Sequence, residues 1–298
     1  MSAITAPRHQ FQAYPFHMVE SSPWPLLMGN AVLSMMVSAV LWFNGIEYSS
    51  LLLTLGVLSV VFAFILWFRD VTIEGTYLGD HTLIVQKGLT MGVSLFIVTE
   101  AFFFISIFWA YFHSSLAPTV ELGSQWPPAG IETLNPFAVP LLNTILLLSS
   151  GATVTYSHHA LIYGNRRAAL IGVVLTLVLA TVFTLLQGFE YINAGFTIAD
   201  GVYGTCFYFS TGFHGVHVIV GTLFIGVAAY RIYAYHLTSD HHIGFESSIL
   251  YWHFVRRCMA IPLRSSIHLG IRLNPIKTII INFTQLPYTI FDIVNLLK

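Results

Sequence analysis

The sequence predicts an all-α integral membrane protein, a single bundle of membrane-spanning helices. Of its 298 residues, 56% are hydrophobic and only 8% are charged, and the mean hydropathy is +0.75. Soluble domains carry roughly 25% charged residues, so this composition excludes a soluble protein. The apolar residues fall in runs of about 20 residues, the length that a helix needs to cross a hydrocarbon core. No repeat of fixed period and no Pro/Ser-rich linker divides the chain into a string of domains.

Six membrane spans are clear from the hydropathy pattern, and the loops between them are mostly short. Tryptophans near the span ends, among them Trp24, Trp42 and Trp67, are typical of an interfacial aromatic belt. A seventh span begins near Phe245, but it meets two arginines close to mid-membrane, where each costs about 2.5–3.5 kcal/mol on insertion scales. In chain order the six spans are 23–43, 50–68, 88–112, 136–156, 168–192 and 203–235.

Basic residues predict the orientation of the bundle. None lies in the loops after the first, third and fifth spans, so the positive-inside rule places the amino terminus on the inner, matrix or cytoplasm-like face. The six basic residues before position 256 are Arg8, Arg69, Lys87, Arg166, Arg167 and Arg231.

One carboxylate stands inside the third span. Glu100 lies thirteen residues after Lys87, which puts it roughly 20 Å into a hydrocarbon core of about 30 Å. No Lys or Arg shares its span, so we expect the carboxyl to be protonated at neutral pH. A structural hydrogen bond to a neighbouring helix, a proton-relay or regulatory role, and access for lipid or inhibitor all stay open. Glu190, near the end of the fifth span, is the second such carboxyl.

The histidines give a weak case for a metal or haem. His158 and His159 are adjacent and point about 100° apart on a helix, so they do not both bind one ion. His214 and His217 share a helix face, but no facing pair completes a site, and we predict hydrogen-bonded packing with a ligand role left open. Ser210 precedes His214 without a G-x-S-x-G turn, which argues against a hydrolase. We therefore predict no metal site and no catalytic residue in this chain.

Many ordered motifs between about His17 and Val255 closely resemble cytochrome c oxidase subunit III, of the mitochondrial type. The motifs are W-P-L-L at Trp24, F-R-D at Phe68, V-Q-K-G-L at Val85, T-E-A-F-F-F at Thr99, F-H-S-S-L-A-P-T-V-E-L-G at Phe112, W-P-P-x-G-I, L-N-P-F-x-V-P-L-L-N-T, S-S-G-x-T-V-T, D-G-V-Y-G, G-F-H-G-x-H-V-I-x-G and Y-W-H-F-V.

The resemblance implies seven helices, with the first two separated from the other five by a cleft that holds phospholipids. It implies a non-catalytic subunit of respiratory complex IV, which reduces oxygen with electrons from cytochrome c and pumps protons. The subunit would support stability, bound lipid and proton uptake, and haem a and copper would lie in partner subunits such as I and II, with no nucleic acid involved. It also implies a multi-pass protein of the mitochondrial inner membrane. The family's intramembrane carboxylate falls on Glu100, and its phospholipid contacts fall on Arg69, Glu74, His81, Arg231 and His236.

The resemblance ends after Val255, which divides the chain into a subunit III-like region, 1–255, and a tail, 256–298. The first region carries six basic and twelve acidic residues, and the tail carries six basic residues against Asp292. Pro262, Gly270 and Pro275 interrupt any helix there. We expect the seventh helix to be truncated or altered, and the tail to be non-family coding sequence, such as intron read-through or a frame change, with a lineage-specific extension as the alternative.

Two other functions stay open. A multi-pass transporter or channel would suit the bundle and Glu100, although no inverted repeat or broken pair of spans is visible. A metal- or haem-dependent oxidoreductase would need a cofactor bound to this chain itself.

Overall fold

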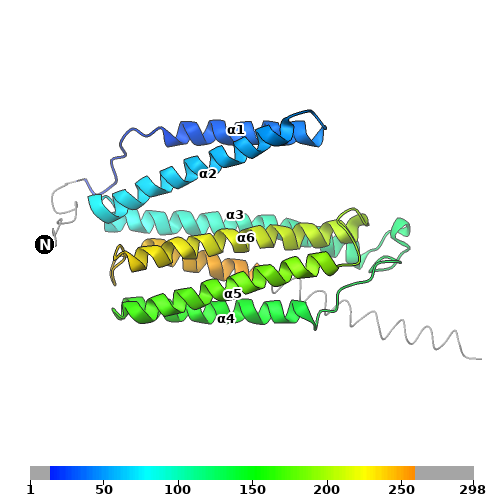
Figure 1. The fold of residues 1–298 in the computed structure, drawn as a ribbon. Helices are drawn as coiled ribbons and strands as arrows, with labels where there is room; N and C mark the ends of the chain where they lie inside the picture. The colour runs from blue at the N-terminus through cyan, green and yellow to red at the C-terminus, as the bar shows by residue number, and fades with distance from the viewer. Residues whose placement is uncertain (1–13, 259–298) are drawn as a thin grey trace, which may run out of the picture. The chain divides into compact units, whose positions relative to one another are not determined.

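The computed structural model describes residues 14–258, which form helices and loops and no strand. Six of these helices are long and apolar enough to cross a membrane, which confirms the six predicted spans. Figure 1 shows them as long rods joined by short connections, apart from the longer loop between α3 and α4. The elements are α1 (Trp24–Phe43), α2 (Ser49–Ile73), η2 (Glu74–Leu78), α3 (Leu83–Leu116), η3 (Val120–Leu122), α4 (Val139–Ile162), α5 (Arg166–Asn193) and α6 (Gly201–Tyr233).

Several helices run beyond the apolar spans that the sequence predicts. The helical region after Ser49 continues to Leu78, ten residues past the predicted end at 68, and α3 has 34 residues where the span 88–112 has 25. A helix satisfies its own backbone hydrogen bonds wherever it lies, so it does not stop where the apolar residues stop. Hydropathy therefore locates the spans well and their ends less well.

The chain forms two compact units, Met1–Gly92 and Val93–Lys298, divided within α3. In the first unit α1 and α2 pack antiparallel (Figure 1). Gly56 permits this close approach, because a Cβ there would lie 2.8 Å from the Met35 Cα. At the other end the Trp24 indole N–H donates a hydrogen bond to the Asp70 carboxylate, which ties the start of α1 to the end of α2.

In the second unit α4 and α5 pack along their length through small residues (Figure 1). A Cβ at Gly172 would lie 2.8 Å from the Ser157 Cβ. The Ser157 hydroxyl donates to the Ala169 carbonyl at 2.6 Å, and the Thr153 and Thr176 hydroxyls lie 2.8 Å apart. Helices in a membrane usually associate through small residues and interhelical hydrogen bonds. Lipid tails are as apolar as a neighbouring helix, so the hydrophobic effect does not drive the helices together.

A further helix occupies residues 243–258, and its start agrees with the seventh span predicted near Phe245. Trp252 is fully buried, and its indole N–H donates to the Ser150 hydroxyl of α4 at 3.0 Å. On α6, Gly221 leaves room for the same indole ring, because a Cβ there would lie 3.0 Å from it. The helix therefore packs against both α4 and α6.

The helix continues through Arg256 and Arg257, where the sequence predicts a heavy cost. The Arg256 guanidinium donates to the Leu148 carbonyl of α4 at 3.2 Å and lies 3.0 Å from the His253 Nδ1. These partners offset part of the cost of placing an arginine there. The rest of the predicted tail, 259–298, lies outside the described residues.

Candidate functional site

Glu100 and His217 form the main polar contact between α3 and α6. The Glu100 Oε2 lies 3.0 Å from the His217 Nε2, and the two side chains are 23% and 9% exposed. The sequence singled out both residues but did not pair them. A structural hydrogen bond to a neighbouring helix was one of the roles left open for Glu100, and His217 is the partner in that bond.

The hydrogen bonds of His217 restrict where protons lie. Its Nδ1 is 2.9 Å from the Phe213 carbonyl oxygen, which only accepts, so Nδ1 carries a hydrogen. The Nε2–carboxylate contact then needs one more proton between its two atoms. Either a neutral Glu100 donates to a neutral imidazole, or a protonated imidazole donates to an ionised Glu100. In both forms the pair is neutral overall, which suits its surroundings in lipid.

Aromatic rings surround this pair. The His217 ring packs on Phe213 with centroids 4.5 Å apart, on Phe104 at 5.3 Å and on Tyr251 at 6.0 Å. Phe104 and Tyr251 are themselves buried. The rings hold the imidazole in one orientation and exclude other polar partners from its faces.

His214 and His217 of α6 are predicted to share a helix face, but their rings contact different neighbouring helices. His214 is 3% exposed and turns its ring edge-on to Phe183 of α5, with centroids 6.0 Å apart. Neither of its ring nitrogens has a hydrogen-bond partner among the described residues. The predicted hydrogen-bonded packing is therefore right for His217 and wrong for His214, because three residues of helix turn the two rings toward different neighbours.

Three predicted phospholipid contacts lie at the end of α2 and just beyond it. The Arg69 side chain is 57% exposed and forms an ion pair with Asp70, with 2.9 Å between the Arg69 Nη2 and the Asp70 Oδ1. Glu74 begins η2, and its carbonyl accepts from the Asp80 backbone N–H. The His81 ring packs over Gly75, where a Cβ would lie 2.6 Å from its Nδ1. His81 and Glu74 thus belong to one turn, whereas Arg69 is engaged with its neighbour in sequence.

The other two predicted contacts, Arg231 and His236, lie at the end of α6. The His236 backbone N–H donates to the Arg231 carbonyl at 2.9 Å, and the His236 ring packs edge-on to Tyr230. Partial burial, and secondarily the positive charge of Arg231, lower the pKa of His236. The two residues thus form a corner at the end of α6 in which burial and the Arg231 charge disfavour the protonated form of the imidazole.

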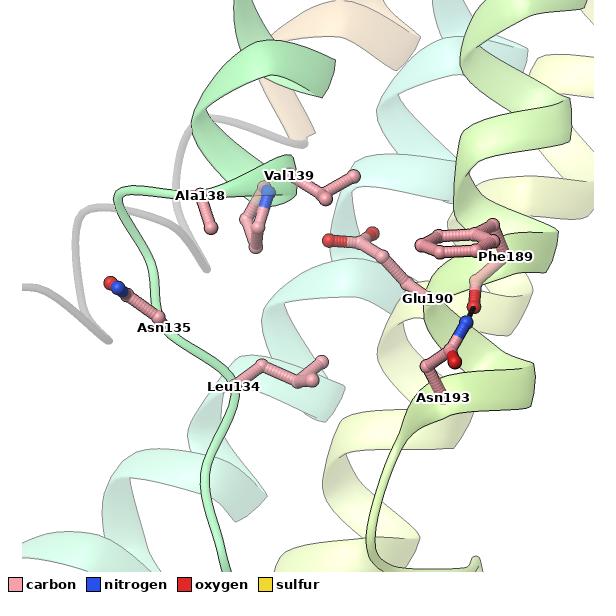
Figure 2. Close-up of a pocket in the computed structure, with 8 residues that line it drawn as sticks. Leu134, Asn135, Ala138, Val139, Phe189, Glu190 and Asn193 are labelled. Carbon is pink, nitrogen blue, oxygen red and sulfur yellow. Dashed lines mark hydrogen bonds between the residues drawn. The ribbon is translucent and has the colours of Figure 1, made fainter.

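Glu190 lines a small pocket between the first turn of α4 and the last turn of α5. Figure 2 shows its carboxylate directed from α5 toward Val139. Its Oε2 accepts from the Asn143 amide at 3.0 Å, whereas the Glu190 Oε1 and the Asn143 Oδ1 are buried and without a partner among the described residues. Two neighbouring acceptors without donors point to a bound water or a proton on the carboxyl. The full lining is Leu134, Asn135, Ala138, Val139, Pro140, Phe189, Glu190 and Asn193.

Comparison with known proteins gives one consistent result. A family model described as cytochrome c oxidase subunit III matches residues 14–260. The chain is 65% identical over 253 residues to the cytochrome c oxidase subunit 3 of Mycosarcoma maydis, covering 83% of this chain and 92% of that protein. It is 60% identical over 248 residues to the protein of the same name from Podospora anserina, with the same coverage. The protein of that name from Rhizopus stolonifer is 61% identical over 244 residues, covering 82% of this chain and 86% of the relative.

Proposed function

Because this chain belongs to the cytochrome c oxidase subunit III family, we propose that it is a non-catalytic membrane subunit of the respiratory oxidase, complex IV. The observation that carries the proposal is the family match over 14–260, which covers all six membrane spans. The comparisons give no support to the transporter or channel alternative. Haem a and copper would be held by partner subunits, including subunits I and II, and those subunits would carry out the chemistry.

The proposed work of this chain is to support the stability, bound lipid and proton uptake of the complex. The Glu100–His217 pair suits the first of these roles, since it joins α3 to α6 with a hydrogen bond that lipid does not compete for. It also suits a role in proton uptake, because it holds one exchangeable proton in a mostly apolar setting. An unpaired carboxylate would be far more costly there.

Phospholipid binding is proposed at two separate places in the chain. Arg231 and His236 supply a guanidinium and an imidazole at the end of α6, which suits a phosphate headgroup. Arg69 offers an exposed guanidinium at the end of α2, near Glu74 and His81 in sequence. The basic side chains at both places would lie at the matrix-side surface of the mitochondrial inner membrane, where the amino terminus would also lie.

Mass mapping of the purified haem a-containing oxidase tests this proposal. We expect peptides from 14–255 in one-to-one ratio with the catalytic subunits, and the tail peptide 273–277 reports whether 256–298 is present. Removing the chain should leave haem a and copper content unchanged and shorten the working life of the enzyme during turnover. Absence of the chain from the oxidase, or loss of haem a with it, would refute the proposed role.

A further inference from the structure

Three potential metal ligands meet at one end of the second unit. His158 lies near the end of α4, His242 just precedes the 243–258 helix, and Glu246 lies one turn into that helix. The two Nε2 atoms are 3.2 Å apart, and the Glu246 Oε1 is 3.3 Å from His242 and 3.9 Å from His158. The three ligand atoms are therefore close enough together to contact a single metal ion.

These separations match the ligand spacing around a tetrahedral zinc ion. Zinc binds histidine nitrogen at about 2.0–2.1 Å and carboxylate oxygen at about 2.0–2.2 Å, so tetrahedral ligand atoms lie roughly 3.3–3.5 Å apart. Two of the three observed separations lie within about 0.1 Å of this range. The third, from His158 to Glu246, needs a movement of about half an ångström by a half-exposed carboxylate. Two imidazoles and one carboxylate are a common zinc ligand set, with water in the fourth position.

The Nδ1 hydrogen bond of His242 leaves the lone pair of its Nε2 directed toward His158 and Glu246, where that Nε2 shares either a proton or an ion with the His158 Nε2. The His242 Nδ1 is 3.0 Å from the Thr238 carbonyl oxygen, so Nδ1 carries the hydrogen. In the neutral ring Nε2 then presents a lone pair, with a carboxylate oxygen at 3.3 Å. Two acceptors at this distance repel each other unless a cation stands between them, either a proton or a metal ion. A histidine that donates its other nitrogen to a carbonyl is also the usual outer-shell arrangement of a metal ligand.

The surrounding residues hold the ligands in place and leave one side accessible. Phe245 is fully buried and packs edge-on against the His158 ring, with centroids 5.9 Å apart. Thr238 receives the His241 backbone N–H on its hydroxyl at 3.0 Å, which fixes the loop before His242. Glu246 is 46% exposed, so an ion can reach the centre from outside.

We propose that His158, His242 and Glu246 form a zinc site that joins the end of α4 to the start of the 243–258 helix. The sequence pattern does not predict this site, because His158 stands next to His159 and no complete ligand set lies near it in the sequence. His159 is exposed and is not among the three ligands, in keeping with the predicted divergence of adjacent histidines. A bound ion would add a second link between the start of this helix and α4, beside the ring contact of Phe245 with His158.

The test is zinc binding and zinc X-ray absorption on the intact oxidase, repeated with the full chain alone in lipid nanodiscs. The variants are His158→Gln, His242→Gln and Glu246→Gln, and His159→Gln is the matched control. We expect one zinc ion with two imidazoles and at least one oxygen in the first shell. Each ligand variant should weaken binding by more than the roughly 10–100-fold that outer-shell changes cost, and the control should bind as the wild type does.

The proposal is overturned if the wild-type chain binds no zinc at this place, in which case a shared proton explains the three distances. It is also overturned if the ligand variants and His159→Gln bind equally well, or if the X-ray absorption shows fewer than two imidazoles. The wild-type spectrum decides alone where a variant does not assemble. The nanodisc sample separates this result from a failure of the chain to be part of the oxidase.

Discussion

The Glu100 carboxylate and the His217 imidazole share one hydrogen bond between α3 and α6, and that bond holds a single exchangeable proton. The Phe213 carbonyl fixes the hydrogen on Nδ1, so the remaining proton lies between Nε2 and the carboxylate. We therefore expect one outcome when a substitution removes only the shared proton and another when it removes the hydrogen bond as well.

Glu100→Gln should keep the hydrogen bond and remove the exchangeable proton, because an amide N–H can donate to Nε2. We expect normal assembly, together with the loss of one protonated-carboxyl band in difference infrared spectra. Glu190→Gln is the control for the second intramembrane carboxyl. An unchanged infrared spectrum in Glu100→Gln would mean that the wild-type carboxyl is ionised and His217 is the protonated partner.

Glu100→Ala should destabilise the chain, because it leaves the buried His217 Nε2 without a partner. An unsatisfied buried polar group costs about 1–3 kcal/mol. Unfolding of the chain in mixed micelles would measure the loss, and Glu100→Gln should lose much less. Equal losses in the two variants would show that the hydrogen bond contributes little.

Gly172→Ala should weaken the packing of α4 on α5. Its Cβ would lie 2.8 Å from the Ser157 Cβ and 3.0 Å from the Thr153 carbonyl oxygen, so the helices must move apart. Overpacking of this kind typically costs about 1–3 kcal/mol. Gly188→Ala in the same helix is the matched control, because nothing lies within 4 Å of its Cβ, and it should not destabilise the chain. Unfolding in micelles would compare the two, and equal effects would contradict the packing described for α4 and α5.

The pKa of His236 should respond to the charge at position 231. Burial and the positive charge of Arg231 both lower this pKa, so Arg231→Gln should raise it and Arg231→Lys should leave it low. Because the folded protein binds this proton less tightly than the unfolded chain, the stability from this residue is present above about pH 6.5 and falls as the pH drops below that value. Histidine NMR of the chain in nanodiscs measures the shift.

Adding a lipid with an anionic headgroup should oppose the lowering of the His236 pKa by Arg231. A phosphate at the corner formed by Arg231 and His236 would raise the pKa of His236 relative to neutral-headgroup nanodiscs. The rise should be smaller in Arg231→Gln, which retains the imidazole but lacks the guanidinium. The same rise in both proteins would place the headgroup elsewhere.

The sequence predicts the six spans because twenty apolar residues have few alternatives to a membrane helix, and it misplaces their ends because helices continue past the apolar run. At the candidate site it finds Glu100 from depth and charge alone. It does not find the partner, because His217 is 117 residues away and its i,i+3 spacing drew attention to His214 instead. The zinc ligands were missed for the same reason, since His158 and His242 are 84 residues apart. The i,i+4 spacing of His242 and Glu246 was the available signal.

Arg256 and Gly151 give the last prediction, because the absence of a side chain at Gly151 is what admits the guanidinium to α4. A Cβ at Gly151 would overlap the Arg256 guanidinium, so Gly151→Ala must displace the group from the Leu148 carbonyl. We expect a loss of about 1.5–3 kcal/mol, the usual range for a hydrogen bond to a charged group. In an Arg256→Leu background the same glycine change should cost little, so the double mutant should lose less stability than the sum of the two single losses in a double-mutant cycle. Additive effects in micelle unfolding would mean that the arginine finds an equivalent partner elsewhere.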